Sequence, residues 1–168
     1  MELFDTIETR SSAGRLTEPG PSRDDLERLL KAAARAPDHG RLKPWRFIVL
    51  NGPDRTPFAK AAAAAKRLRV PTMTDEQVAS EQRKIERSPT IVLAACVVDR
   101  AKTKIPEIEQ VIAVGAAVEN LFLAAHALGY GVMWKTGAAA YDPAVKAAVG
   151  LRPDDHIVAI LHLGTPSK

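Results

Sequence analysis

The chain has 168 residues, the usual size of one folded unit, so we expect a single domain over residues 1–168. Hydrophobic residues make up 46% and charged residues 26%, which excludes a disordered or fibrous chain. The lone cysteine, Cys96, excludes an intramolecular disulfide and a cysteine-based zinc site, and we expect no metal. No apolar run approaches the roughly 20 residues that cross a bilayer, and the first residues are acidic rather than signal-like. We therefore predict a cytoplasmic protein with no membrane partner.

The net charge of +4 raises the question of nucleic-acid binding. The 24 lysines and arginines are nearly balanced by 20 acidic residues. The densest basic run, residues 66–69, contains no aromatic side chain on which a base could stack. We therefore predict no nucleic-acid partner.

The first half of the chain predicts several helices and one strand. Leu3, Phe4 and Ile7 share one helical face, and the polar residues 10–14 end that helix. Ser22 with Asp25 three residues later resembles a capping box and opens a second helix. The remaining elements expected here are a strand over residues 46–50 and two peripheral helices over 56–69 and 75–87.

The second half predicts the centre of the fold. Residues 90–98 form a continuous run of β-branched and small apolar residues, which indicates a strand buried on both faces. Residues 106–128 are apolar nearly all round a helix, as expected for a core helix or a dimer seam. Residues 132–134 and 156–163 predict two more strands. Because several strands follow loops rather than crossover helices, the pattern favours a mixed or antiparallel α+β fold.

Familiar catalytic templates are missing. The chain has no phosphate-binding P-loop, and the Gly129-x-Gly131 pair lacks the third glycine of the dinucleotide fingerprint. The four histidines do not form a zincin helix, and no G-x-S-x-G elbow is present. Cys96 lies within an apolar strand, where burial raises the pKa of a thiol, so we interpret it as an inert packing residue.

Three polar segments are not explained by composition. In Arg10-Ser11-Ser12 the guanidinium and hydroxyls suit a phosphate, although a frayed helix end would look the same. The second segment, residues 35–45, crowds a cation, an imidazole and an indole into a proline-punctuated turn. The third, residues 134–137, reads Trp-Lys-Thr-Gly at a strand end, where either a ligand or an exposed lysine at a turn is expected.

Together these segments resemble the flavin-dependent nitroreductase family, and more narrowly its small YdjA-type subgroup. The matching blocks occur in family order and span nearly the whole chain. They are Arg10-Ser-Ser12, then Ala36-Pro-Asp-His39 with Lys43-Pro-Trp45, then Gly131-Val-Met-Trp134-Lys-Thr-Gly137, and finally Leu163-Gly-Thr-Pro166.

The resemblance implies an α+β homodimer, with a mixed or antiparallel sheet flanked by helices and FMN in the subunit interface. It assigns no catalytic side chain, because the cofactor performs the chemistry. The implied FMN contacts are Arg10, Ser11 and Ser12 to the phosphate, Arg35 and His39 from the partner chain, and Trp134, Lys135 and Thr136 along the same flavin. The subgroup also implies a nicotinamide contact at Ala124, Ala125, His126, Ala127, Leu128 and Gly129.

The implied activity is hydride uptake from NADH or NADPH, followed by reduction of a small planar acceptor, nitroaromatic or quinone-type, in a ping-pong cycle. Two alternatives stay open at this point. One is other flavin chemistry on the same scaffold, such as reductive dehalogenation. The other is a flavin-binding interaction protein with little turnover.

The chain departs from the family pattern at two places. Many relatives carry Arg or Lys where this chain has Gly14, so flavin tuning is expected to differ. Relatives also continue past the last strand, whereas this sequence stops at Lys168. We expect either a more open flavin pocket or a shortened sequence.

Overall fold

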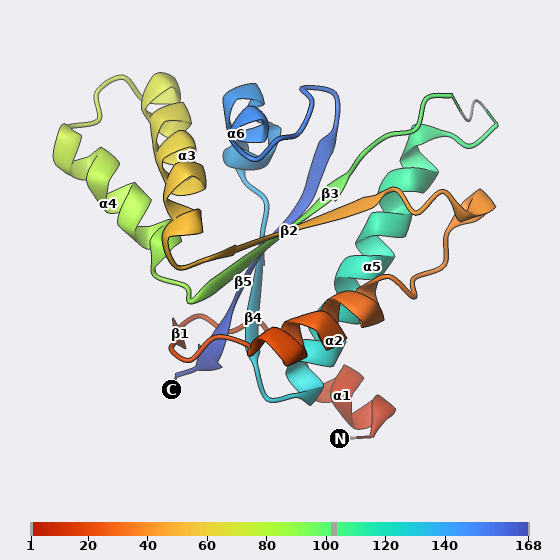
Figure 1. Ribbon diagram of the computed structural model, residues 1–168. Helices are drawn as coiled ribbons and strands as arrows, with labels where there is room; N and C mark the ends of the chain where they lie inside the picture. The colour runs from red at the N-terminus through yellow and green to blue at the C-terminus, as the bar shows by residue number, and fades with distance from the viewer. Residues whose placement is uncertain (1, 102–103, 168) are drawn as a thin grey trace.

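A computed structural model describes residues 2–101 and 104–167 of the chain, and within these residues five strands form one sheet (Figure 1). Their order is β1-β5-β3-β2, and β4 also pairs with β5. Every pairing is antiparallel. The strands are β1 Leu16–Thr17, β2 Trp45–Asn51, β3 Thr90–Cys96, β4 Gly131–Lys135 and β5 His156–Pro166.

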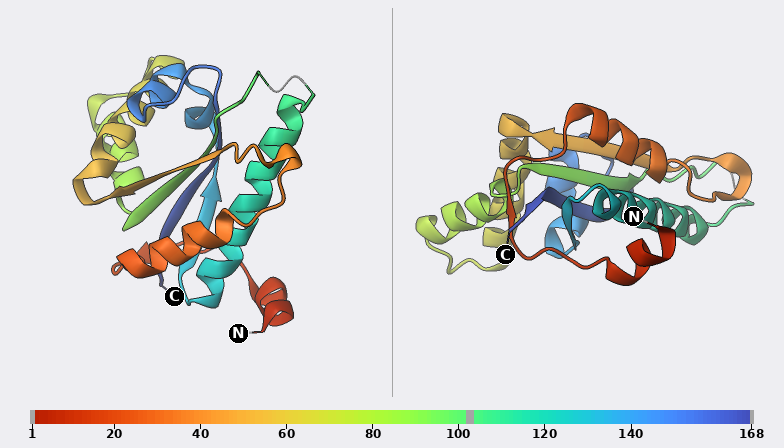
Figure 2. Two further views of the ribbon diagram at one scale, coloured as in Figure 1. Left: turned by 45° about the vertical axis from the view of Figure 1, so that its right-hand side comes forward. Right: turned by 90° about the horizontal axis from the view of Figure 1, so that it is seen from below.

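Helices cover both faces of the sheet (Figures 1 and 2). One face is covered by α2 and α5, and the other by α3 and α6, with α4 packed outside α3. The short α1 packs near the end of α5, where Thr9 Oγ1 lies 3.0 Å from His126 Nε2. The helices are α1 Leu3–Thr9, α2 Arg23–Ala33, α3 Arg55–Arg69, α4 Asp75–Glu86, α5 Glu107–Ala127 and α6 Pro143–Ala148.

The prediction that β3 is central and buried on both faces is confirmed. It lies between β2 and β5, and all seven of its residues are buried. Because side chains alternate along a strand, Val92 and Ala94 pack toward α2 and α5, while Ile91 and Leu93 pack toward α3 and α6. β3 therefore joins the two halves of the core.

The apolar helix α5 packs in the core along one side and is open along another. We expected no apolar run long enough to cross a membrane, but α5 is long and apolar enough to do so. Inside the protein, 44% of its most apolar stretch is buried. It packs against α2 and the sheet, as a core helix does. It is not wrapped on all sides by its own chain, however, because Ile108 and Ile112 are each 62% exposed. One face of α5 is thus apolar and uncovered.

The prediction that residues 56–69 and 75–87 form peripheral helices is right for α4 and wrong for α3. No residue of α4 is buried, and the helix begins with a capping box between Thr74 and Gln77. In α3, by contrast, Phe58 and the alanines on its inner face are buried in the core beneath the sheet. Alanines give a weak apolar signal in the sequence, but they allow close packing of the helix on the strands. The prediction did not include β1 or α6.

The segment after α1 lies along the outer edge of β4. The backbone N–H of Ala13 donates to the carbonyl of Val132 at 2.9 Å, and β1 then pairs with the end of β5. This close approach requires glycine at position 131, because a Cβ there would lie 2.8 Å from Ala13 Cβ and 2.7 Å from Leu16 Cδ2. Residues 13–18 are thereby held beside β4 and β5.

Candidate functional site

A cavity of about 790 Å³ lies where residues 13–18 meet the end of α4 and the edge of the sheet. This volume falls in the usual range for small-molecule sites. Besides residues 13–18, its wall is formed by Lys84, Arg87, Ser88, Met133, Lys135, His162 and Ser167. We treat this cavity, called the β4 cavity below, as the candidate site.

The β4 cavity is rich in positive charge. Among its described lining residues are the cations Arg15, Lys84, Arg87 and Lys135 and one carboxylate, Glu18. Among the described residues Arg15, Arg87 and Lys135 form no ion pair, whereas Lys84 is paired outside the cavity. Unpaired cations around a concave surface concentrate positive potential, so the cavity suits an anionic ligand such as a phosphate ester.

Strand alternation decides which residues of β4 enter the cavity. Val132 packs on the α5 side of the sheet, so Trp134 lies on that side as well, and its Nε1–H donates to the carbonyl of Val158 at 3.3 Å. Met133 and Lys135 point the other way and line the cavity. Thr136 borders a neighbouring groove of about 460 Å³ beneath α3. Of the predicted Trp134, Lys135 and Thr136, only Lys135 lines the β4 cavity.

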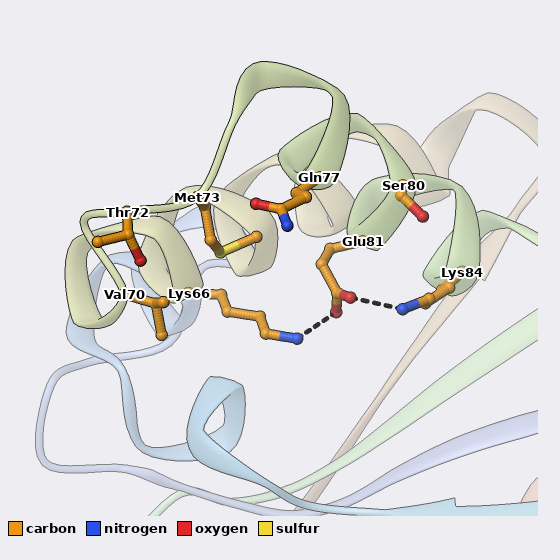
Figure 3. Close-up of a pocket in the computed structure, with 8 residues that line it drawn as sticks. All are labelled: Lys66, Val70, Thr72, Met73, Gln77, Ser80, Glu81 and Lys84. Carbon is orange, nitrogen blue, oxygen red and sulfur yellow. Dashed lines mark hydrogen bonds and ion pairs between the residues drawn. The ribbon is translucent and has the colours of Figure 1, made fainter.

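A smaller hollow of about 380 Å³ lies between α3 and α4 (Figure 3). Figure 3 shows Lys66 from α3 and Lys84 from α4 converging on Glu81, at 2.8 Å and 2.6 Å. The bonds from Lys66 and Lys84 hold the pKa of Glu81 below its ordinary value. Because its cations are neutralised in this way, the hollow is a weaker candidate for an anionic ligand than the β4 cavity.

Arg10, Ser11 and Ser12 immediately precede the wall of the β4 cavity. The Arg10 guanidinium lies 4.8 Å from the centre of the Phe122 ring of α5, and Ser11 and Ser12 are exposed. The chain then enters the cavity wall at Ala13 and Gly14. A side chain at Gly14 would meet nothing within 4 Å, so the glycine leaves this part of the wall uncovered.

The structure places His39 at the other end of α5 from Arg10. His39 Nδ1 lies 2.6 Å from Oε2 of Glu109, whereas Arg35 is exposed just after the end of α2. Glu109 and Phe122 are separated along α5 by roughly 20 Å, given the 1.5 Å rise per residue. A single chain therefore does not bring His39 to Arg10.

The predicted nicotinamide segment, Ala124 to Gly129, forms the end of α5. Ala125 is fully buried, and Gly129 has a φ of +85° that ends the helix. The N–H of Tyr130 donates back to the carbonyl of Ala125 at 2.9 Å. None of these residues lines the β4 cavity, and their contact with nicotinamide stays a prediction.

The sequence interpretation did not include the pair Ser88 and His162 on the cavity wall. Ser88 precedes β3, His162 lies within β5, and Oγ of Ser88 is 2.8 Å from Nδ1 of His162. Burial, together with the charge of Lys135, lowers the pKa of His162 to about 4. The signal in the sequence was a histidine inside an otherwise apolar strand.

Two other groups have structural roles. Burial raises the pKa of Cys96 to about 11, in agreement with its interpretation as an inert thiol. In the basic run at the end of α3, Lys66, Arg67 and Arg69 each pair with a carboxylate, so the run is not a free positive stripe. Over the ranges 2–101 and 104–167, no group of three or more His, Cys, Asp or Glu could hold a metal ion.

An antiparallel sheet between two helical layers, with a cation-lined cavity at its edge, defines an α+β protein with a cavity suited to an anionic ligand. Solved structures share this fold. The "nitroreductase-like family protein" from Bacillus cereus has a TM-score of 0.84 and 26% identity, with 100% of this chain and 87% of that chain covered. A "putative nitroreductase in complex with FMN" from Desulfovibrio desulfuricans has a TM-score of 0.77 and 26% identity, with 100% and 88% covered.

The chain belongs to the nitroreductase family, whose family model matches residues 7–165. It is 36% identical over 169 residues to the "Putative NAD(P)H nitroreductase YdjA" of Escherichia coli K12, covering 99% of this chain and 89% of that protein. It is also 32% identical to a "Putative NAD(P)H nitroreductase" of Haemophilus influenzae, covering 98% and 89%. The predicted family and the predicted α+β fold are both confirmed.

Proposed function

We propose that this chain is an FMN-dependent oxidoreductase that takes hydride from NADH or NADPH and reduces nitroaromatic or quinone-type acceptors in a ping-pong cycle. The whole chain, residues 1–168, forms its single FMN-binding domain. The observation that carries the proposal is the β4 cavity in a member of the nitroreductase family. Three cations of its described wall, Arg15, Arg87 and Lys135, form no ion pair with described residues. The relative named as an NAD(P)H nitroreductase and the related structure with FMN support the cofactors.

The residues present fit FMN. The phosphate of FMN is a dianion, and Arg10, Ser11 and Ser12 provide a guanidinium and two hydroxyls at the edge of the cavity wall. Lys135, Arg87 and Arg15 provide positive charge inside the cavity, where an electron-rich ring is stabilised. When bound, FMN supplies the hydride chemistry.

The chain itself contributes orientation and electrostatics. With the pKa of the Cys96 thiol raised to about 11, this cysteine stays protonated at neutral pH and is not a nucleophile. Arg10 would hold the phosphate, and the cations of the cavity would place positive charge beside the ring. An FMN ring with one face open to the cavity would accept many planar acceptors.

The homodimer is part of this proposal and is supported by uncovered apolar residues. Leu3, Phe4 and Ile7 on α1 are between 49% and 76% exposed, and Ile108 and Ile112 near the start of α5 form a second exposed apolar group. Exposed apolar surface of this kind marks an interaction site, and a two-fold axis is the commonest way to cover it. A two-fold axis would also allow Arg35 and His39 of one chain to reach the Arg10 end of the other.

The unpaired Cys96 suits a reducing compartment, and we place the protein in the cytoplasm.

The test is the absorbance spectrum of the purified protein, repeated without oxygen after NADH or NADPH is added. We expect flavin bands that bleach with a nicotinamide nucleotide and recover when a quinone is added. Bands that never bleach would favour a flavin-binding interaction protein over an enzyme. A protein that neither contains nor binds FMN would overturn the proposal.

A further inference from the structure

The inner wall of the β4 cavity carries a buried polar pair that the FMN-phosphate contacts do not use. His162 is 4% exposed and Ser88 is 8% exposed. In β5, His162 lies opposite Ile91 of β3 and Met133 of β4, so backbone pairing on both sides fixes its position. The imidazole of His162 is therefore held by the sheet, and Ser88 lies just before β3.

The hydrogen bonds of this pair favour one tautomer of the imidazole. The Ser88 hydroxyl needs an acceptor for its hydrogen, and Nδ1 of His162 at 2.8 Å is the acceptor that the structure offers. If the hydroxyl donates to Nδ1, the proton of the neutral ring lies on Nε2. We infer this tautomer, in which the Ser88 hydroxyl donates to Nδ1 and Nε2 carries the proton.

This donor is open to the cavity. Every fully buried side-chain nitrogen and oxygen in residues 2–101 and 104–167 has a hydrogen-bond partner. Nε2 of His162 has no partner among these residues, so it is not sealed in the core, and the cavity that His162 lines is the β4 cavity. The ring is also uncharged, because burial and the nearby Lys135 lower its pKa to about 4. The wall therefore presents a fixed, neutral N–H among cations.

We propose that Nε2–H of His162 donates a hydrogen bond to an acceptor atom of the isoalloxazine ring of bound FMN. The inference rests on the proposed function and adds a residue to the site. A flavin ring carries carbonyl oxygens and ring nitrogens at its edge, and a fixed donor recognises them without the desolvation cost of a second charge. Ser88 is the positioning residue that selects the donor tautomer.

The test compares FMN dissociation constants, measured by fluorescence titration, for the parent protein, His162→Phe, His162→Gln and a control. His162→Phe keeps a ring of similar size but removes the donor, and we expect about tenfold weaker FMN binding. His162→Gln retains an N–H donor and should recover most of the affinity. The control is His156→Gln, which alters an exposed histidine bonded to Glu107 and should leave binding unchanged.

A second readout follows the ring itself. In ¹⁵N NMR spectra of the FMN-free protein, we expect His162 to show the neutral Nε2–H tautomer, and FMN should shift that Nε2–H signal. Ser88→Ala should give a mixture of tautomers and weaker FMN binding. Circular dichroism and thermal melting show whether each variant is folded. If His162→Phe does not fold, the FMN affinity of His162→Gln is compared with that of the parent instead.

The outcomes separate the two proposals. If the parent binds FMN and His162→Phe binds it equally well, the role of His162 is overturned while the proposed function stands. An Nε2 signal that does not change with FMN has the same meaning. If the parent protein does not bind FMN at all, both proposals are overturned together.

Discussion

At the scale of single residues, the buried His162 makes stability depend on pH. Its pKa is lowered from 6.5 to about 4 in the folded chain, so between these values the unfolded chain binds the proton more readily. The stabilisation is complete above pH 6.5 and is lost as the pH falls to about 4. The loss amounts to about 3 kcal/mol, given roughly 1.4 kcal/mol per pKa unit.

Urea unfolding at pH 7, 5.5 and 4 measures this effect. Carboxylates titrate in the same range, so the informative quantity is the difference between the parent and His162→Phe. We expect the parent to lose stability more steeply toward pH 4, because the variant has no imidazole to protonate. Parallel pH profiles for the two proteins would contradict the assignment.

Arg10 permits a second prediction at this scale. Its guanidinium packs on the Phe122 ring and forms no ion pair with described residues, so it is free to bind a phosphate. We expect Arg10→Ala to weaken FMN binding by about 10- to 100-fold, the usual value of a charge-assisted hydrogen bond, and to change the melting temperature little. Lys31→Ala, which removes an exposed cation of α2 paired with Glu27, is the control. Equal FMN affinity in Arg10→Ala and the parent would remove Arg10 from the site.

At the scale of elements, α5 is the most sensitive part of the fold. Ala117 is fully buried, whereas Ala127 lies in the exposed last turn of the same helix. We expect Ala117→Lys to cost about 3–5 kcal/mol, because it buries an unpaired charge in a packed core. Ala127→Lys should have little effect, since a cation suits the end of a helix. Urea midpoints of the two variants test this, and a similar loss in both would show that burial does not set the cost.

The elements that the sequence predicted well are those with a strong pattern of their own. The run of β-branched residues in β3 and the length of α5 were sufficient to place both at the centre. β1 has only two residues and exists because it pairs with the end of β5, a contact across about 150 positions that no local pattern contains. The inner face of α3 was missed because alanine gives little hydrophobic signal.

The candidate site shows the same division. Motifs predicted Arg10, Ser11 and Ser12 and the strand end at Lys135 as contacts of FMN. The structure places Lys135 in the cavity wall, and the FMN contacts stay predictions. The Ser88–His162 pair was not found, because its members are 74 positions apart and meet only through the register of β3 and β5. That Trp134 and Lys135 lie on opposite faces of the sheet follows from strand alternation, once the bounds of β4 are known.

At the scale of the whole molecule, the separation of two predicted FMN contacts along α5 is the basis for proposing a site shared between two chains. Arg10 lies at Phe122 and His39 at Glu109, roughly 20 Å apart by the helical rise. If each site combines Arg10 of one chain with His39 of the other, changing either residue damages both sites of a homodimer.

The exposed Ile112 on α5 lies on the face that would pair the chains, so Ile112→Glu should give a folded monomer in sedimentation experiments.

Mixing two defective variants tests the shared site directly. In a mixed dimer of Arg10→Ala and His39→Ala chains, one site contains both changes and the other contains neither. We expect that unfolding and refolding the two variants together restores FMN binding of parental affinity at one of the two sites of each mixed dimer. Each variant refolded alone should bind FMN weakly at both sites. Differently tagged chains allow the mixed dimer to be purified and its tight FMN sites to be counted. If no tight site appears in that dimer, Arg10 and His39 do not meet across the interface, and the FMN site is built from one chain.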